Sequence, residues 1–214
     1  MDGSAAAVPL RVRLREATRR AHHELDGHPI LAPLVRSGLT LPEYVRALDA
    51  LNWIYSSIDP LLEAAMLKYA PEAAFRTSPR LRWLREDLKH FGLRVRTSPW
   101  KPTAVTSLPV LIGCLYVVEG STLGGQVVAR CVESALGVGP GAGGRFFHGH
   151  GTASAEHWGA FIALAERSCT DADAACLAAQ SLFQVIRERL DLRYAEYTGV
   201  HPQPMADAGA RQPE

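Results

Sequence analysis

The sequence predicts a single all-α domain, and three observations lead to this fold class. Apolar residues recur at helical spacing along most of the chain, helix start and stop signals flank these segments, and no run of alternating β-branched residues indicates a sheet. The chain has 214 residues, of which 47% are hydrophobic, so it can bury a sizeable core. Neither an internal repeat nor a linker divides it.

The first two helices have clear end signals. The segment LRVRLREATRRAHHELDG has apolar residues at helical spacing and ends at Gly27, a typical helix stop. The next helix opens with Thr40 and Glu43 at the spacing of a capping box. Pro60 predicts either a bend in this helix or its division into two.

The third helix is expected in SPRLRWLREDLKHFG. Ser78 is predicted to be its N-cap, Pro79 its first residue and Gly92 its stop.

The second half of the chain predicts three more helices. The first covers about residues 107–136, contains three glycines and is stopped by Gly137. The segment GVGPGAGGRFFHGHG is expected to be a loop. Helices are then expected at roughly 154–168, with Ser154 as the cap, and at 171–197.

The domain boundaries follow from these helices. Residues 1–8 are expected to be a flexible N-terminus, residues 9–198 the helical domain and residues 199–214 a disordered tail. The tail is rich in proline, glycine, alanine and polar residues and has no apolar periodicity.

Charge and cysteine content exclude several classes of protein. Lys and Arg number 23 against 22 Asp and Glu, so neither a nucleic-acid nor a membrane-surface partner is predicted. The N-terminus lacks the apolar region of a secretory signal, and the longest apolar run is too short to span a bilayer. We therefore expect a soluble cytoplasmic protein with reduced cysteines; the four are Cys114, Cys131, Cys169 and Cys176.

The glycines within the fourth predicted helix are the first sign of a binding site. A glycine inside a helix costs about 1 kcal/mol relative to alanine, yet Gly120, Gly124 and Gly125 occupy two successive turns. Small residues permit the close approach of either a neighbouring helix or a flat ligand, and a glycine pair favours a kink. Ser121 and Thr122 would add hydroxyl groups to such a ligand-binding wall.

The first helix has the side chains that could hold a ligand against this wall. His22 lies at the flank of the apolar face, beside Thr18, whereas His23 points further toward solvent. Arg15 and Arg19 lie on the same flank and could bind an anionic group. An axial imidazole, cationic side chains and a thinned opposite wall are what a heme slot requires. Tyr116, about one turn before the glycines, could reach the same pocket.

Two segments resemble a known family. LREATRRAHHELD resembles the first helix of heme oxygenases, in which a leucine, an acidic residue and an Ala-Thr pair precede the histidine that ligates the heme iron; His22 matches that ligand. EGSTLGGQ is similar to the kinked distal helix of that family, and its GSTLGG form is most similar to the bacterial heme oxygenases associated with bacteriophytochromes. The resemblance covers about residues 10–197.

The resemblance implies a fold with the ligand between a proximal N-terminal helix and a distal glycine-rich helix. Arg15 and Arg19 then match positions that contact the heme propionates, and Gly120, Gly124 and Gly125 match the glycines that let the distal backbone lie close to the heme. The implied reaction degrades heme, which is both cofactor and substrate, to biliverdin, carbon monoxide and ferrous iron. It uses O2 and electrons from an external donor such as a ferredoxin or a reductase. The implied use of the product is as bacteriophytochrome chromophore, with the alpha position as the expected site of cleavage.

The chain departs from the family at one position. Many members have an aspartate directly after the first distal glycine, where it organises water, and this chain has Ser121. We expect Ser121 to bind water in its place and the backbone at Gly120 to guide the reaction toward one edge of the heme. The alternative is a heme- or biliverdin-binding protein of the same fold that does not turn heme over.

The histidines of residues 148–157 and the cysteines allow two other interpretations. His148, His150 and His157 include an HxH pair that could contribute to a metal site, although no further ligand is specified, and most of this segment is expected to lead into the next helix. A helical enzyme of thiamin metabolism would need a catalytic cysteine, and neither Cys114 nor Cys131 belongs to a recognisable pattern.

Overall fold

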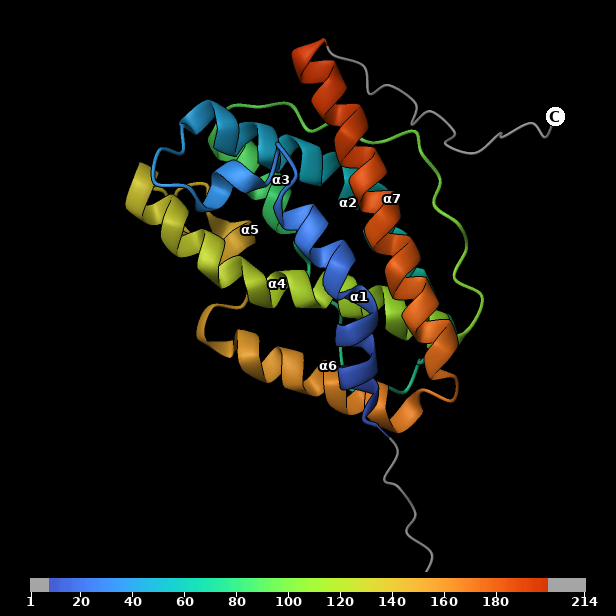
Figure 1. Ribbon diagram of the computed structural model, residues 1–214. Coiled ribbons are helices and arrows are strands. Elements are labelled where there is room, and N and C mark those ends of the chain that lie inside the picture. The colour runs from blue at the N-terminus through green and yellow to red at the C-terminus, as the bar shows by residue number, and fades with distance from the viewer. Residues whose placement is uncertain (1–7, 200–214) are drawn as a thin grey trace, which may run out of the picture.

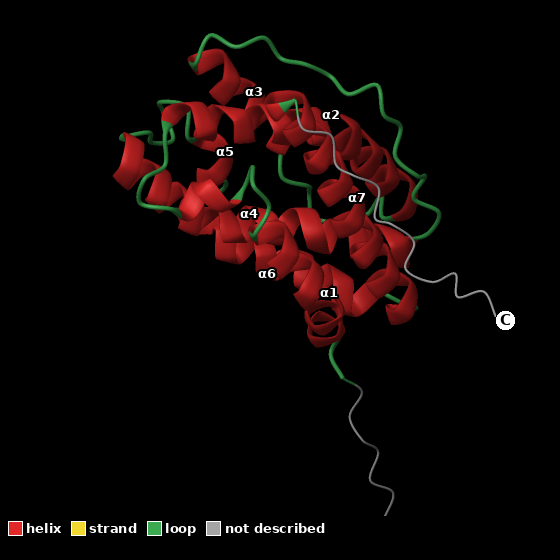
Figure 2. Ribbon diagram, turned by 45° about the horizontal axis from the view of Figure 1, so that its top comes forward, coloured by secondary structure: helices red, strands yellow, loops and turns green. Residues whose placement is uncertain are grey.

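The computed structural model describes residues 8–199, and within this range all regular structure is helical (Figures 1 and 2). In chain order the elements are α1 (Leu10–Asp26), η1 (Ala32–Val35), α2 (Leu41–Tyr69), α3 (Arg80–His90), α4 (Leu108–Leu136), α5 (Arg145–His148), η2 (Gly151–Ala153), α6 (Ser154–Ser168) and α7 (Ala172–Thr198). The predicted all-α fold class is confirmed. The predicted flexible N-terminus and tail lie outside the described residues, apart from Val8 and Gly199.

Helix α4 is the centre of the fold. It packs against α7, α6, α5 and α2, while α1 packs against α7 and α6. In the described range, α4 is the one helix long and apolar enough to cross a membrane; its most apolar 18-residue stretch has a mean hydropathy of 1.4 and is 56% buried. Burial inside the protein accounts for this apolar composition, because a core helix of a soluble protein has the same character.

Helices α1 and α4 do not pack closely on each other along the part of the chain described, although both contact α6 and α7. This arrangement matters because the predicted ligand-binding side chains lie on these two helices.

Most predicted helix ends are confirmed. Helix α1 ends before Gly27, and the capping box at Thr40 and Glu43 is present at the start of α2. Helix α4 ends at Gly137, whose φ of 68° is a left-handed conformation that glycine adopts without strain. Helix α2 continues through Pro60 as one helix, so the predicted division does not occur.

Two predicted caps are wrong. Helix α3 begins at Arg80 with Pro79 before it and has no side-chain cap, because the Ser78 hydroxyl donates to the buried carboxylate of Glu119 instead. Ser154 also caps no helix end; its hydroxyl accepts a hydrogen bond from the Gln126 side chain of α4. In both cases a tertiary partner replaces the local backbone partner that the sequence pattern indicates.

Candidate functional site

His22 projects from the outside of α1 toward α7. Its side chain is 63% exposed, and its ring lies 5.9 Å from that of Phe183 in an edge-on arrangement. The Nδ1 atom lies 2.9 Å from Oδ2 of Asp26, one turn later on α1. Nε2 has no hydrogen-bond partner among residues 8–199, so an imidazole with its proton on Nδ1, beside the carboxylate, has a free lone pair on Nε2. A carboxylate beside the second ring nitrogen is the partner that metal-ligating histidines usually have.

Asp26 was not identified from the sequence. The signal was present, because an acidic residue four positions after a histidine lies on the same face of a helix. The spacing His22–Asp26 would have supported the choice of His22 over His23.

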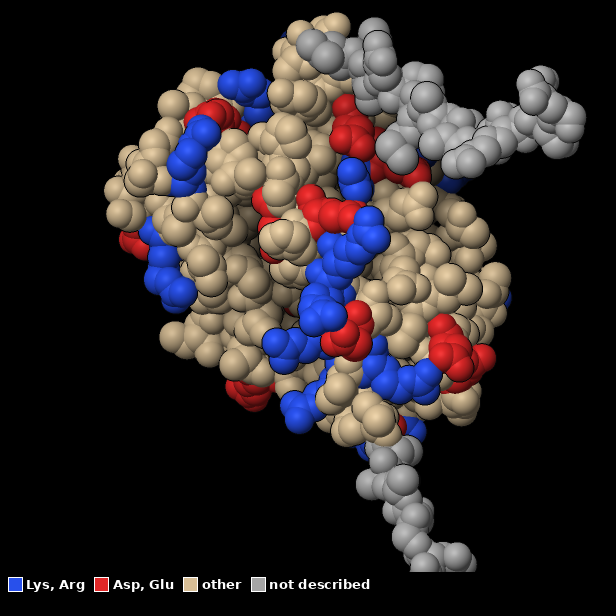
Figure 3. All heavy atoms as spheres, in the orientation of Figure 1, with Lys and Arg blue, Asp and Glu red and all other residues tan. Residues whose placement is uncertain are grey.

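Arginines line the exposed side of α1, where Figure 3 shows basic side chains gathered over this helix. Arg19 forms an ion pair of 2.8 Å with Glu16, and both side chains are largely exposed. Arg15 makes no ion pair with any described residue, so its guanidinium is available to an anionic ligand. The two arginines predicted to bind a ligand thus lie on the exposed part of α1, as His22 does.

The Tyr116 side chain of α4 lies close to α1. Burial raises the pKa of its hydroxyl, while a hydrogen bond with Thr18 and the charge of Arg15 act in the opposite direction. The Thr18 hydroxyl itself donates to the Leu14 carbonyl oxygen at 2.7 Å. Three of the residues predicted for the site, Thr18, Tyr116 and Arg15, are therefore neighbours.

Gly124 lies in the middle of α4 with open space beside it. A Cβ atom built on Gly124 meets no other atom within 4 Å, and the residue is exposed. Ser121, one turn earlier, is also exposed. The described structure therefore contains no packing reason for a glycine at this position.

Gly125, predicted to belong to the ligand-binding wall, is closely packed in the structure. A Cβ atom there would lie 2.9 Å from the carbonyl oxygen of Phe147, so α5 packs directly on this residue. Neighbouring positions on a helix differ by about 100° in direction, so Gly124 and Gly125 face different parts of the molecule.

Gly120 faces an aromatic side chain that the sequence analysis did not place in the site. A Cβ atom on Gly120 would lie 3.7 Å from two ring atoms of Trp158 on α6. The Trp158 ring also lies 5.6 Å from that of Tyr116. Trp158 thus covers α4 beside the residues that join it to α1; sequence spacing cannot reveal this, because α6 follows more than thirty residues later.

Tyr55 of α2 reaches the distal helix. Its hydroxyl lies 3.1 Å from the Ser121 hydroxyl, which donates to the Val118 carbonyl oxygen at 2.8 Å. Because Ser121 uses its own proton for Val118, Tyr55 is the donor. This pair of hydroxyls joins α2 to α4 next to Gly120.

A buried cluster of charges lies on the inner side of α4. The Arg80 guanidinium contacts Glu119 at 2.9 Å and Asp59 at 3.1 Å, and all three side chains are at most 5% exposed. Burial raises the pKa of Asp59 more than Arg80 lowers it. Burial would also raise the pKa of Glu119, but Arg80, His157 and Ser78 outweigh it and lower this pKa to about 2.

Two histidines extend the cluster toward the surface. His157 Nε2 lies 3.1 Å from Glu119, and the His150 and His157 rings stack at 4.0 Å. Both Nε2 atoms also contact the Ser78 hydroxyl, at 2.9 and 3.1 Å. Over the described residues, no group of three His, Cys, Asp or Glu side chains has an arrangement suited to a metal ion. The polar cluster is instead satisfied by its own hydrogen bonds.

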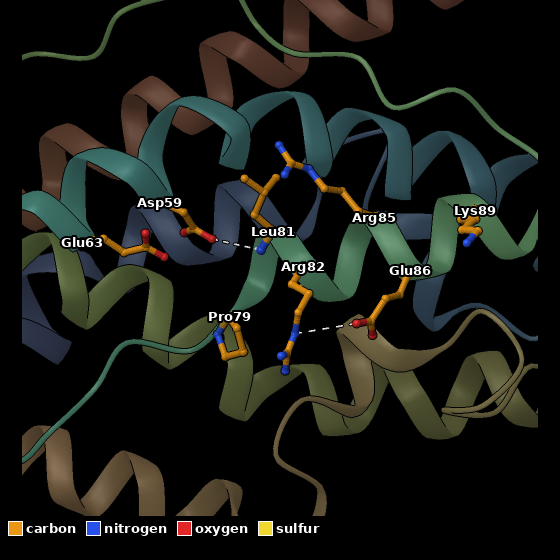
Figure 4. A pocket seen from close by; sticks show the side chains of 8 residues that line it. All are labelled: Asp59, Glu63, Pro79, Leu81, Arg82, Arg85, Glu86 and Lys89. Carbon is orange, nitrogen blue, oxygen red and sulfur yellow. Dashed lines mark hydrogen bonds and ion pairs between the residues drawn. The ribbon is translucent and has the colours of Figure 1, made fainter.

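A cavity lies between α2 and α3, next to the Asp59 end of the buried cluster (Figure 4). It has a volume of about 440 Å³ and mixes acidic and basic side chains, with Asp59 at its inner end. Arg82 and Glu86 form a loose ion pair of 3.7 Å across it. None of the residues predicted for the ligand site lines this cavity; it is formed by Asp59, Glu63, Pro79, Leu81, Arg82, Arg85, Glu86 and Lys89.

Comparison with known proteins adds the family. A sequence model of the heme oxygenase family matches residues 8–188. The structure is similar to heme oxygenase from Neisseria meningitidis (21% identity, TM-score 0.70, covering 88% of this chain and 94% of that one). It is also similar to heme oxygenase from Leptospira interrogans (20% identity, TM-score 0.68, covering 86% of this chain and 98% of that one). A third similar structure is heme oxygenase-1 from the cyanobacterium Synechocystis sp. PCC6803, solved in complex with heme (17% identity, TM-score 0.68, covering 90% of this chain and 93% of that one). No curated protein matches the chain.

Proposed function

Because the chain belongs to the heme oxygenase family, we propose that it binds heme between α1 and α4 and degrades it to biliverdin, carbon monoxide and ferrous iron. Electrons come from an external donor, of which a ferredoxin or a reductase is the expected type. Cleavage at the alpha position and use of biliverdin by a bacteriophytochrome extend this proposal, and the similarity of EGSTLGGQ to bacteriophytochrome-associated members supports them.

Gly124 carries the proposal. A glycine in a helix interior costs about 1 kcal/mol relative to alanine, and a Cβ atom at Gly124 would meet nothing. The cost therefore has no explanation within the described protein, whereas a flat ligand lying against α4 supplies one. By contrast, Gly125 and Gly113 are explained by packing, since a Cβ atom on either would collide with backbone atoms.

The residues on α1 fit a heme. His22 has no hydrogen-bond partner on Nε2 among the described residues, and the Asp26 carboxylate beside Nδ1 can orient the ring, as a carboxylate partner does at many metal sites. Arg15 and Arg19 carry the charges that two propionates require. When bound, the heme supplies the iron at which O2 is reduced and the porphyrin that is oxidised.

Side chains of α4 and α2 would control protons on the other side of the heme. The Ser121 hydroxyl is fixed by the Val118 carbonyl oxygen and by the Tyr55 hydroxyl, so its remaining lone pair can orient a water molecule. Tyr55 is 4% exposed, which keeps this hydroxyl pair shielded from bulk solvent on the side of α2. We infer that this pair performs the role of the aspartate that the chain lacks.

The test is hemin binding followed by turnover. One equivalent of hemin is added to the wild type, His22→Ala and His23→Ala; His23 is the adjacent exposed histidine of α1 and serves as the matched control. Ascorbate or a ferredoxin system is then supplied under air. We expect a Soret band that requires His22 but not His23 and that decays to the spectrum of biliverdin.

Two results would change the proposal. A His22-dependent Soret band that is stable under turnover conditions would favour a protein that binds heme or biliverdin without degrading it. Hemin binding that is equal in all three proteins would reject His22 as the ligand.

A further inference from the structure

We propose that Trp158 determines which edge of the heme is attacked, by closing the end of the slot between α1 and α4 at Gly120. This inference rests on the proposed function. It assigns a specificity role to a side chain that belongs to neither of the two helices expected to enclose the heme.

Helix α6 is in the right place for this role. It contacts both α1 and α4, which do not pack closely on each other in the described part of the chain. On α6, Trp158 is the side chain that lies over Gly120, with ring atoms 3.7 Å from the Cβ position of that glycine. Its ring centroid also lies 5.6 Å from that of Tyr116, whose hydroxyl is close to Thr18 and Arg15 of α1. Trp158 therefore stands at the point where all three helices meet.

The surface of α4 that a planar ligand could contact is covered at Gly120 and open at Gly124. At 3.7 Å the Cβ position of Gly120 is at an ordinary contact distance from Trp158, so an alanine would fit against the indole. At Gly124, one turn later, nothing covers the helix. A planar ligand on α4 thus has free access near Gly124 and meets a large rigid ring at Gly120, which limits how far it can slide or rotate in its own plane.

Buried charges hold Trp158 in position. The preceding residue, His157, bonds to Glu119 at 3.1 Å, and Glu119 is itself fixed by Arg80 at 2.9 Å. On the next turn, Phe161 is fully buried and its ring lies 5.3 Å from the indole. A side chain anchored on both sides in this way can act as a fixed stop for a ligand.

The experiment compares wild type with Trp158→Phe and Trp158→Ala, and uses Trp100→Phe as the control. The Trp100 ring lies under the guanidinium of Arg189 of α7, and its carbonyl oxygen accepts from Ser57 of α2. Three quantities are measured: hemin affinity, the hyperfine-shifted heme methyl resonances of the cyanide-bound ferric complex, and the biliverdin isomers separated by chromatography. The methyl resonances report the in-plane orientation of the heme without any turnover.

We expect Trp158→Ala to alter the heme methyl pattern, to produce more than one biliverdin isomer where the wild type produces one dominant isomer, and to weaken hemin binding about tenfold, equivalent to about 1.4 kcal/mol. Trp158→Phe should give a smaller change in the same direction, and Trp100→Phe none.

An unchanged methyl pattern and isomer distribution in Trp158→Ala, despite a lower melting temperature, would overturn the proposal and leave Trp158 as a packing residue. Failure of the proposed function would give a different result, because the wild type would then show no hemin binding that depends on His22. If hemin binds but is not degraded, the heme methyl resonances alone test whether Trp158 sets the in-plane orientation of the heme.

Discussion

The Nδ1 atom of His22 and the Oδ2 atom of Asp26 lie 2.9 Å apart on the exposed side of α1. A histidine held in this way has one nitrogen committed to orientation and the other available to iron. The pair therefore gives a test of the ligand that does not depend on removing the histidine.

Asp26→Ala should lower hemin affinity about tenfold or more, the range found when second partners of metal-ligating histidines are removed. The reason is that the His22 ring loses its orientation and part of its basicity. Hemin titration and the frequency of the iron–histidine stretch in resonance Raman spectra measure the two effects. Asp26→Asn, which keeps an acceptor but loses the charge, should lie between the wild type and Asp26→Ala. Equal iron–histidine frequencies in all three proteins would exclude this role of Asp26.

Gly124→Ala and Gly125→Ala should have opposite effects on the protein without heme. The first is expected to stabilise it by up to about 1 kcal/mol, because alanine favours the helix and meets no neighbour. The second should destabilise it by about 1–3 kcal/mol, because its Cβ atom would lie 2.9 Å from the Phe147 carbonyl oxygen. Urea unfolding measures both. Hemin affinity should fall in Gly124→Ala despite the gain in stability; an unchanged affinity would contradict a heme lying against Gly124.

Tyr55→Phe should slow turnover about tenfold or more while leaving hemin affinity unchanged, because the phenolic proton that fixes Ser121 is lost. Single-turnover oxidation of bound hemin measures the rate. Tyr69→Phe is the matched control on the same helix, since the Tyr69 hydroxyl donates to the Val105 carbonyl oxygen away from α4. Equal rates in the two variants would show that Ser121 does not depend on Tyr55.

Arg80→Met should cost about 3–5 kcal/mol of unfolding free energy, because it leaves the carboxylates of Asp59 and Glu119 buried without their cation. Arg82→Met, two residues later on α3, should change it by no more than about 0.5 kcal/mol, since that side chain is 68% exposed. Denaturant unfolding of both variants near neutral pH measures the difference. Similar losses would mean that the buried cluster is open to water.

Glu119→Gln should reduce the dependence of stability on acidic pH. The folded-state pKa of Glu119 is lowered to about 2, so the unfolded state binds a proton first as the pH falls. The carboxylate therefore stabilises the fold fully above the ordinary range of glutamate pKa values, and this contribution is lost as the pH falls toward 2. The stability difference between wild type and variant should accordingly be largest near neutral pH and smaller at about pH 3. A difference that stays constant would contradict the lowered pKa.

Local patterns in the sequence predicted the six long helices, but not α5, which lies in the segment expected to be a loop. Periodicity and the stops at Gly27 and Gly137 predicted α1 and α4, because these signals act through the backbone of the same segment. The prediction of His22 as the iron ligand, and of Gly120 and Gly124 as part of a binding wall, also depended on residues within one or two helical turns. Where a side chain had a choice between a local and a distant partner, as Ser78 and Ser154 had, the local pattern predicted the wrong one.

Only the tertiary structure decided which glycines are free and which are packed. Gly124 and Gly125 are adjacent and chemically identical in the sequence, and the approach of α5 to one of them distinguishes their roles. The same holds for Tyr55, Glu119 and Trp158, whose partners lie on helices distant in the chain. Helix formation is determined by neighbours along the chain, and the sequence by itself was enough for the all-α fold and the two candidate heme-binding helices. The composition of the site is determined by neighbours in space, because a few strong long-range contacts select among positions that the sequence leaves equivalent.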